Sequence, residues 1–85
     1  MLLSDSAAEK LARVLLAWLD KTHDTRAPGQ FRFTLTHEEM AQMIGTSRET
    51  VTRQLAVFRR KRFIQQNGST MVVRNRMALE SMLVR

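Results

Sequence analysis

The sequence contains no cysteine, and it has only one tryptophan, one proline and three glycines among its 85 residues. Without cysteine, neither a disulfide framework nor a thiolate metal site can form. No apolar run approaches the length of a membrane-spanning helix. The opening residues 1–4 are far too short for a signal peptide. We therefore expect a soluble, intracellular chain that does not enter a membrane.

Residues suited to catalysis are equally scarce. The two histidines, His23 and His37, fall on different expected elements, and no Ser/His/Asp or paired-carboxylate spacing occurs. The sequence therefore predicts no enzyme, and it offers no metal or cofactor site. Aromatic residues make up only 6% of the chain. Because binding of single-stranded RNA relies on exposed aromatic side chains, that function is also disfavoured.

Positive charge is concentrated in one part of what should be a single small domain. The net charge is +6, and residues 46–63 alone carry six Lys/Arg and one Asp/Glu. A polyanion is the natural partner of such a segment, because each phosphate that it neutralises releases condensed counterions. The alternative for the basic run at residues 59–62 is that it merely complements the dipole at a helix C-terminus.

Residues 36–45 are predicted to form a short helix. Thr36 can cap it, and Glu39 completes a T-x-x-E capping box. Ala41 is small enough to allow a second helix to cross closely, and Gly45 ends the helix because glycine adopts positive φ without steric cost. The expected apolar stripe consists of Met40, Met43 and Ile44.

A second helix is expected over residues 47–61, opened by another capping box from Thr46 to Glu49. Its spacing at 100° per residue places Val51, Leu55 and Phe58 on one side. The opposite side carries Glu49, Arg53, Ala56 and Arg60, flanked by Arg48, Thr52 and Arg59. Two helices in this order, over about residues 36–61, predict a helix-turn-helix.

The polar side of the second helix suits a reader of the major groove. There, an arginine can bond to guanine O6 and N7, and a glutamate can accept a hydrogen bond from cytosine N4. Two structural alternatives stay open. Glu49 could serve only its capping box, and Arg53 could form an ordinary surface pair with Glu49 at i+4.

The remaining segments complete a recognisable order of elements. Residues 4–21 predict an amphipathic helix with a capping box from Ser6 to Glu9, and Trp18 is expected in its core face. Residues 23–30 predict a loop, and residues 31–35 a strand with Phe31 and Phe33 facing inward. Asn75 is expected to cap a last helix over residues 76–83, with four apolar residues available for packing: Met77, Leu79, Met82 and Leu83.

Two β-prone runs, residues 63–66 and 70–73, flank Asn67-Gly68-Ser69 and predict a hairpin. A hairpin directly after a helix-turn-helix is a wing, here over about residues 63–73. Its tip, Gly68 and Ser69, could contact a phosphate through backbone amides and a hydroxyl; the alternative is an ordinary hairpin. The expected fold class is mainly α with a small β-hairpin wing, a winged helix-turn-helix.

Several of these residues resemble a known family. The matching residues are Leu11-Ala12, Leu15-Leu16, Leu35-Thr36, Glu39, Gln42, Ile44-Gly45, Ser47 to Val51, Arg53, Leu55, Phe63-Ile64 and Asn67 to Val73. They resemble the C-terminal DNA-binding domain of the Crp/Fnr regulators, the catabolite activator and fumarate-nitrate family. The likeness covers nearly the whole chain, and S-R-E-T-V-x-R is its most specific part.

The resemblance implies roles for individual residues. By position, it implies that the bases are read by Arg48, Glu49 and Arg53, with preference for a TGTGA-like half-site. It implies phosphate contacts from Thr36, Ser47, Thr50 and Gly68. From their places on the second helix and the hairpin, we add Thr52 to the base readers, and Arg59 and Ser69 to the phosphate contacts. Two departures from the family are Gln54, where relatives carry an apolar residue, and Glu38, whose carboxylate would repel the DNA backbone.

The resemblance also implies a wider setting. Family members are homodimeric bacterial regulators that act in the cytoplasm at the nucleoid, and bending of the DNA is expected by analogy with them. An effector such as a cyclic nucleotide would bind an N-terminal sensory domain that residues 1–85 lack, so we expect weak self-association of this domain alone. The loop at residues 22–30, with Arg26, is where relatives touch RNA polymerase. The alternative function is a winged-helix module that binds an acidic protein surface without reading bases.

Overall fold

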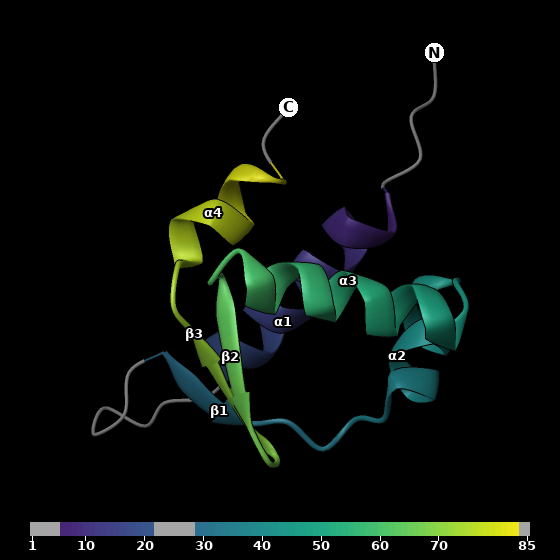
Figure 1. Ribbon diagram of the computed structural model, residues 1–85, viewed down its shortest axis with the longest axis horizontal. Helices are drawn as coiled ribbons and strands as arrows, with labels where there is room; N and C mark the ends of the chain where they lie inside the picture. The colour runs from purple at the N-terminus through teal and green to yellow at the C-terminus, as the bar shows by residue number, and fades with distance from the viewer. Residues whose placement is uncertain (1–5, 22–28, 84–85) are drawn as a thin grey trace.

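A computed structural model describes residues 6–21 and 29–83, and its ribbon is shown in Figure 1. The elements follow the predicted order of helix, strand, two helices, two strands and helix. They are α1 (Ala7–Lys21), β1 (Gln30–Arg32), α2 (His37–Ile44), α3 (Arg48–Arg60), β2 (Ile64–Asn67), β3 (Thr70–Val73) and α4 (Arg76–Ser81). The expected fold class is confirmed, since the described chain is a mainly helical winged helix-turn-helix with a small sheet.

Helix α1 lies behind α3 in Figure 1 and supplies much of the core. Its first turn has the predicted capping box, in which the Ser6 amide donates to Glu9 Oε1 at 3.3 Å and the Glu9 amide donates to Ser6 Oγ at 3.1 Å. Since Ser6 is the cap, the helix begins at Ala7 rather than at residue 4. The buried side chains of α1 are Leu11, Ala12, Leu15, Leu16 and Leu19, and those of α3 are Val51, Leu55 and Phe58.

The sheet has three antiparallel strands in the order β1-β3-β2. The sequence predicted the hairpin and the strand before it but not the pairing of that strand with β3, because a pairing across some forty residues leaves no local pattern. Strand β1 is shorter than predicted: it pairs from Gln30 with Val72 to Arg32 with Thr70, where β3 begins. Beyond it, the Phe33 amide still donates to the Ser69 carbonyl at 2.7 Å.

Two aromatic residues after the first loop anchor the sheet against α1. Phe31 and Phe33 are buried, as predicted, and their rings are 5.7 Å apart. The Trp18 ring meets Phe33 edge to face at 5.2 Å. Trp18 packs against the core, as predicted, and its side chain is half-buried. Tryptophan is rarely enclosed completely because its side chain is large.

The predicted wing is present. Ile64 pairs with Val73 and Asn67 pairs with Thr70, which leaves Gly68 and Ser69 as a two-residue turn. Gly68 has φ of 60°, a conformation that favours glycine. The hairpin therefore projects its exposed tip from the sheet, as Figure 1 shows.

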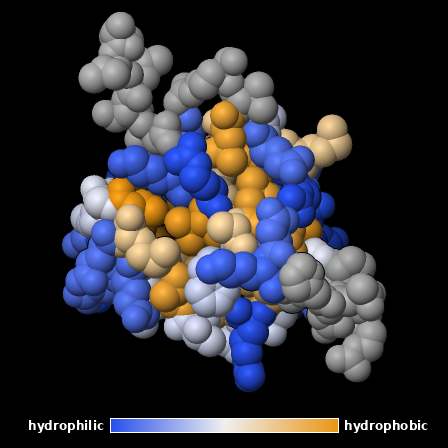
Figure 2. Space-filling view, turned by 180° about the vertical axis from the view of Figure 1, so that it is seen from behind, coloured by the Kyte–Doolittle hydropathy of each residue, from blue (hydrophilic) through white to orange (hydrophobic). Residues whose placement is uncertain are grey.

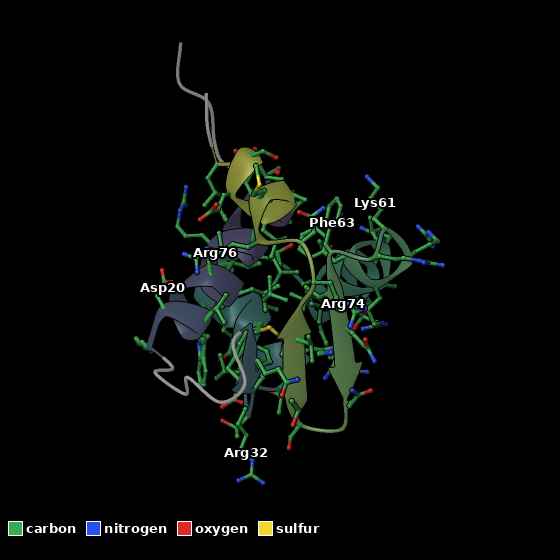
Figure 3. The ribbon with its side chains drawn as sticks, turned by 90° about the vertical axis from the view of Figure 1, so that its left-hand side faces the viewer. Asp20, Arg32, Lys61, Phe63, Arg74 and Arg76 are labelled. Carbon is green, nitrogen blue, oxygen red and sulfur yellow. The ribbon has the colours of Figure 1, made fainter. Side chains whose placement is uncertain are left out.

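Helix α4 is tied to α1 at the surface. Asn75 caps it by accepting from the Ala78 amide at 3.1 Å, as predicted. Arg76 donates to Glu80 at 2.8 Å and to Asp20 of α1 at 2.9 Å. Arg76 and Asp20 are labelled in Figure 3. Hydrogen bonds to these two carboxylates, Glu80 first, raise the pKa of the Arg76 guanidinium.

The end of this helix differs from the prediction. It stops at Ser81, and of its apolar residues only Leu79 is buried. Met77 was expected to pack but is 78% exposed. Six residues make fewer than two turns, so α4 can present only a narrow face to the core.

The rear face of the molecule carries exposed hydrophobic surface, shown in Figure 2. A groove of about 410 Å³ lies between α1 and α2. It is lined by Lys10, Arg13, Val14, Ala17, Trp18, Lys21, Met43 and Ile44. Met43 was predicted to face the core but is 58% exposed, because it lines this groove while Met40 and Ile44 fill the interior. None of the described helices is long and apolar enough to cross a membrane.

Candidate nucleic-acid interface

The helix pair α2–α3 is built from local hydrogen bonds that the sequence largely predicted. The Thr36 amide donates to Glu39 Oε1 at 2.8 Å, and the Glu39 amide donates to Thr36 Oγ1 at 3.0 Å. Gly45 ends α2 with φ of 74°, in the left-handed region. Ala41 is buried, as expected for the residue at the crossing. Gly45 thus forms the turn between α2 and α3, and the small Ala41 side chain is enclosed in the core.

Helix α3 begins one residue later than predicted. Its cap is Ser47, whose hydroxyl accepts from the Thr50 amide at 3.1 Å, so the expected capping box from Thr46 to Glu49 is wrong. The Thr46 amide instead donates to the Ala41 carbonyl at 2.9 Å and so helps to terminate α2. The first residue of α3 is therefore Arg48, and the side-chain oxygen that caps the helix belongs to Ser47.

This shift leaves the Glu49 carboxylate without a capping role. The Arg53 guanidinium does not pair with it, since its hydrogen bond runs to Thr50 Oγ1 at 3.5 Å. Within residues 6–21 and 29–83, no hydrogen bond or ion pair of the Glu49 side chain occurs. Both structural alternatives for Glu49 are therefore removed, and its charge faces solvent.

The proposed base readers share one exposed face. Arg48, Glu49, Thr52 and Arg53 are all exposed on the N-terminal half of α3. Glu49 and Arg53 lie opposite the buried Val51 and Leu55, and Arg48 and Thr52 flank them. Next to them, a crevice of about 500 Å³ separates α2 from the start of α3. Its lining residues are Glu38, Ala41, Gln42, Thr46, Arg48 and Glu49. The Glu38 carboxylate thus belongs to the same surface as the readers.

The Thr52 hydroxyl is held by a residue that sequence reasoning overlooked. The Nδ1 atom of His37, the first residue of α2, lies 2.7 Å from Thr52 Oγ1. The sequence could have indicated this contact, because His37 directly follows the Thr36 cap and the first turn of α2 faces α3 in this motif. His37 therefore links the two helices at the proposed reading surface.

The candidate phosphate contacts lie on several elements. Thr36 caps the start of α2. Ser47 and Thr50 lie at the start of α3, where their hydroxyls are 2.9 Å apart. Gly68 and Ser69 stand exposed at the wing tip. Arg59 is exposed in the last turn of α3, about 16 Å along the helix axis from Arg48. The structure therefore separates Arg59 from the other candidates.

The described residues contain none of the side-chain clusters that bind metal ions. No group of three or more His, Cys, Asp or Glu side chains there could hold a metal ion. Gln54, which stands where relatives carry an apolar residue, is half-buried at the edge of the α3 core face. The polar side chain is therefore not enclosed in the interior.

A capped helix pair, a basic second helix and a β-hairpin together define a winged helix-turn-helix domain. The model of the Crp-like helix-turn-helix domain family matches residues 9–82, and the chain belongs to this family. Its members are transcriptional regulators rather than enzymes, and this fold is their DNA-binding part.

Similar proteins agree with this assignment. A CRP-like cAMP-activated global transcriptional regulator of Mycobacterium tuberculosis is 38% identical over 66 residues, which span 75% of this chain and 29% of that protein. The catabolite activator protein of Thermus thermophilus is 30% identical with a TM-score of 0.70, over 91% of this chain and 33% of that one. FixK2 from Bradyrhizobium japonicum shares the fold, with a TM-score of 0.83 at 22% identity, over 94% of this chain and 39% of that one. The chain thus spans well under half the length of these relatives.

Proposed function

We propose that this domain reads the sequence of double-stranded DNA, with the N-terminal half of α3 in the major groove. The observation that carries the proposal is the exposed Glu49 carboxylate between Arg48 and Arg53, which has no partner within the described parts of the chain. A purely non-specific basic surface gains nothing from a carboxylate at its centre. A base reader does, because cytosine N4 needs an acceptor.

Each reader has a chemical role in this proposal. Arg48 and Arg53 donate to guanine O6 and N7, and Glu49 accepts from cytosine N4, which fits a TGTGA-like half-site. Thr52 adds a hydroxyl whose direction is set by His37. Because arginine and glutamate recognise the two partners of G·C pairs, the set favours sites with such pairs in each half.

The phosphate contacts position α3 without reading sequence. Thr36, Ser47 and Thr50 offer hydroxyls where two helices begin, and helix N-termini attract phosphate. Gly68 and Ser69 would reach the backbone from the wing. Glu38 works against these contacts, because its exposed carboxylate shares their surface.

In the cell, we propose that the domain acts within a dimeric transcriptional regulator in the bacterial cytoplasm. Dimerisation on a palindrome doubles the contacts of one domain. An effector such as a cyclic nucleotide would bind a separate sensory domain, and RNA polymerase would be contacted through the loop at residues 22–30. Arg26 and the rest of residues 22–28 lie outside the described residues.

Fluorescence anisotropy tests this function. Binding of the domain is measured on a palindromic TGTGA-containing duplex and on a scrambled duplex of equal length, at two salt concentrations. We expect the palindrome to bind more tightly at both, while both affinities fall with salt. Equal binding to the two duplexes would leave only a basic patch. Absence of binding would favour the alternative, a protein-interaction module.

A further inference from the structure

Three arginines from separate segments surround one hollow at the foot of the wing. Arg59 comes from the last turn of α3, Arg62 from the connection to β2, and Arg74 from the residue after β3. They line a cavity of about 270 Å³ together with Ile64 and Gln65. Arg74 is labelled beside the hairpin in Figure 3. None of the carboxylates in the described part of the chain lines this hollow.

The three guanidinium groups also lack ion-pair partners within residues 6–21 and 29–83. Arg76, two residues beyond Arg74, shows the contrast, because it is paired with both Asp20 and Glu80. Lys61 is also engaged elsewhere, with its Nζ 5.9 Å from the centre of the Phe63 ring. Three like charges at one place repel one another, and an anion between them would remove that repulsion.

The backbone at Arg62 departs from the usual helix ending. The Arg62 amide donates to the Arg59 carbonyl at 3.0 Å, and the Phe63 amide donates to the Phe58 carbonyl at 2.9 Å, a pattern that normally places glycine at the left-handed position. Arg62 has φ of 63° and is the only non-glycine residue with positive φ in the described chain. An arginine kept there at a conformational cost points to a role for its side chain.

Backbone hydrogen bonds hold Arg74 next to this turn. The Phe63 carbonyl accepts from the Arg74 amide at 2.8 Å and from the Asn75 amide at 3.1 Å. The adjacent pairing of Ile64 with Val73 fixes the two strands at the same level. The hollow is therefore formed by anchored backbone on both sides, which places the Arg62 and Arg74 side chains together.

We propose that Arg59, Arg62 and Arg74 form a phosphate-binding site distinct from the base-reading surface. Guanidinium groups bind phosphate oxygens through paired, charge-assisted hydrogen bonds, and Gln65 adds an amide donor. The phosphate has two possible sources: DNA backbone flanking the half-site, or a free phosphorylated small molecule. If the phosphate belongs to DNA, this site rests on the proposed function. If the phosphate belongs to a free small molecule, the site does not depend on that function.

Two variants and a control test the site. Arg62→Gly removes a guanidinium and relieves the left-handed strain, so we expect the melting temperature to hold or rise while phosphate binding weakens. A merely structural arginine would not give these opposite changes. Arg74→Gln removes a second donor group. Lys61→Gln is the matched control, because it removes one neighbouring charge that does not line the hollow.

The first arm uses DNA. Duplexes holding only the palindrome are compared with duplexes extended by about one helical turn on each side. If flanking phosphate is the ligand, Arg62→Gly and Arg74→Gln weaken binding to the extended duplex roughly fivefold or more and lower its salt slope by about one, while Lys61→Gln has less effect. The preference for palindromic over scrambled sequence stays unchanged in all three.

The second arm uses pyrophosphate without DNA, followed by calorimetry and by NMR shifts of the Arg62, Gln65 and Arg74 amides. Saturable binding that is lost in both arginine variants and kept in Lys61→Gln supports a free ligand. The proposal is overturned if pyrophosphate does not bind and the arginine variants match the control on extended DNA. Loss of palindrome preference in the wild type would instead count against the proposed function, and the pyrophosphate arm would still decide this site.

Discussion

The His37 imidazole and the Thr52 hydroxyl are joined by a 2.7 Å hydrogen bond between α2 and α3. The bond couples the first turn of α2 to the surface proposed to face DNA. Since His37 is only half-buried and Thr52 is exposed, water competes for both groups, and the stability gained is modest.

We expect His37→Ala to lower the free energy of unfolding by about 0.5–1 kcal/mol, measured by urea denaturation. Its affinity for the palindromic duplex should also fall, because the Thr52 hydroxyl loses its fixed direction. His37→Asn, which keeps an acceptor near the Nδ1 position, is the control and should retain most of both quantities. Wild-type affinity and stability in His37→Ala would show that the bond has no such role.

The capping of α3 gives a second prediction. Ser47→Ala removes the acceptor of the Thr50 amide and should destabilise the domain by about 1 kcal/mol. Thr46→Ala should cost less than about 0.5 kcal/mol, because only the Thr46 backbone is used. Thermal denaturation of the two variants decides the point, and a larger loss in Thr46→Ala would return the cap to Thr46.

The turn between α2 and α3 depends on the backbone of Gly45. A Cβ at this residue would meet no atom within 4 Å, so the cost of Gly45→Ala comes from its φ of 74° alone. We expect a loss of about 1–2 kcal/mol for alanine and a smaller loss for Gly45→Asn, since asparagine tolerates this conformation better. Equal stability of wild type and Gly45→Ala, measured by thermal denaturation, would contradict the assignment of strain.

Removing the charge of Glu38 should strengthen DNA binding. Its carboxylate lines the crevice beside Arg48 and Glu49, where it repels the approaching backbone. We expect Glu38→Gln to raise affinity about twofold to fivefold on palindromic and scrambled duplexes alike, because phosphates carry no sequence information. Glu80→Gln on α4 provides a distant charge control. A gain confined to the palindrome would mean that Glu38 affects base reading instead.

Local patterns predicted the parts of the fold that depend on local contacts. The capping boxes at Ser6 and Thr36 lie within four residues of sequence, and the turn at Gly68 follows from the Asn-Gly pair. The buried face of α3 followed from helical spacing. Such contacts are set by neighbouring residues, so the sequence contains them directly.

Features that depend on distant contacts were missed or misplaced. The pairing of β1 with β3 joins residues some forty positions apart. The exposure of Met43 and Met77 depends on whether another helix or strand packs over them, which their own sequence neighbours do not determine. The cap of α3 was misplaced because Thr46 and Ser47 are neighbouring residues that can both cap a helix, and only the folded backbone shows that the Ser47 hydroxyl accepts from the Thr50 amide.

The candidate site divides in the same way. Arg48, Glu49 and Arg53 were predicted from helical spacing and family resemblance, and the structure adds that they are exposed together. His37 and Arg74 were not predicted to belong to a binding site, and Arg62 was considered only as part of the basic run at residues 59–62, because their partners lie on other elements. Only the folded arrangement brings His37 to Thr52, and Arg62 and Arg74 to Arg59.

The most direct measurement is a base-by-base test of Glu49. Affinities of the wild type and Glu49→Ala are measured on the palindromic duplex and on duplexes in which each base pair of both half-sites is replaced in turn. We predict that the wild type loses about 1–3 kcal/mol at the G·C pair whose cytosine Glu49 contacts, and that Glu49→Ala no longer distinguishes that pair while keeping its other preferences. A uniform change across all duplexes in Glu49→Ala, with discrimination at every pair intact, would contradict base reading by this residue.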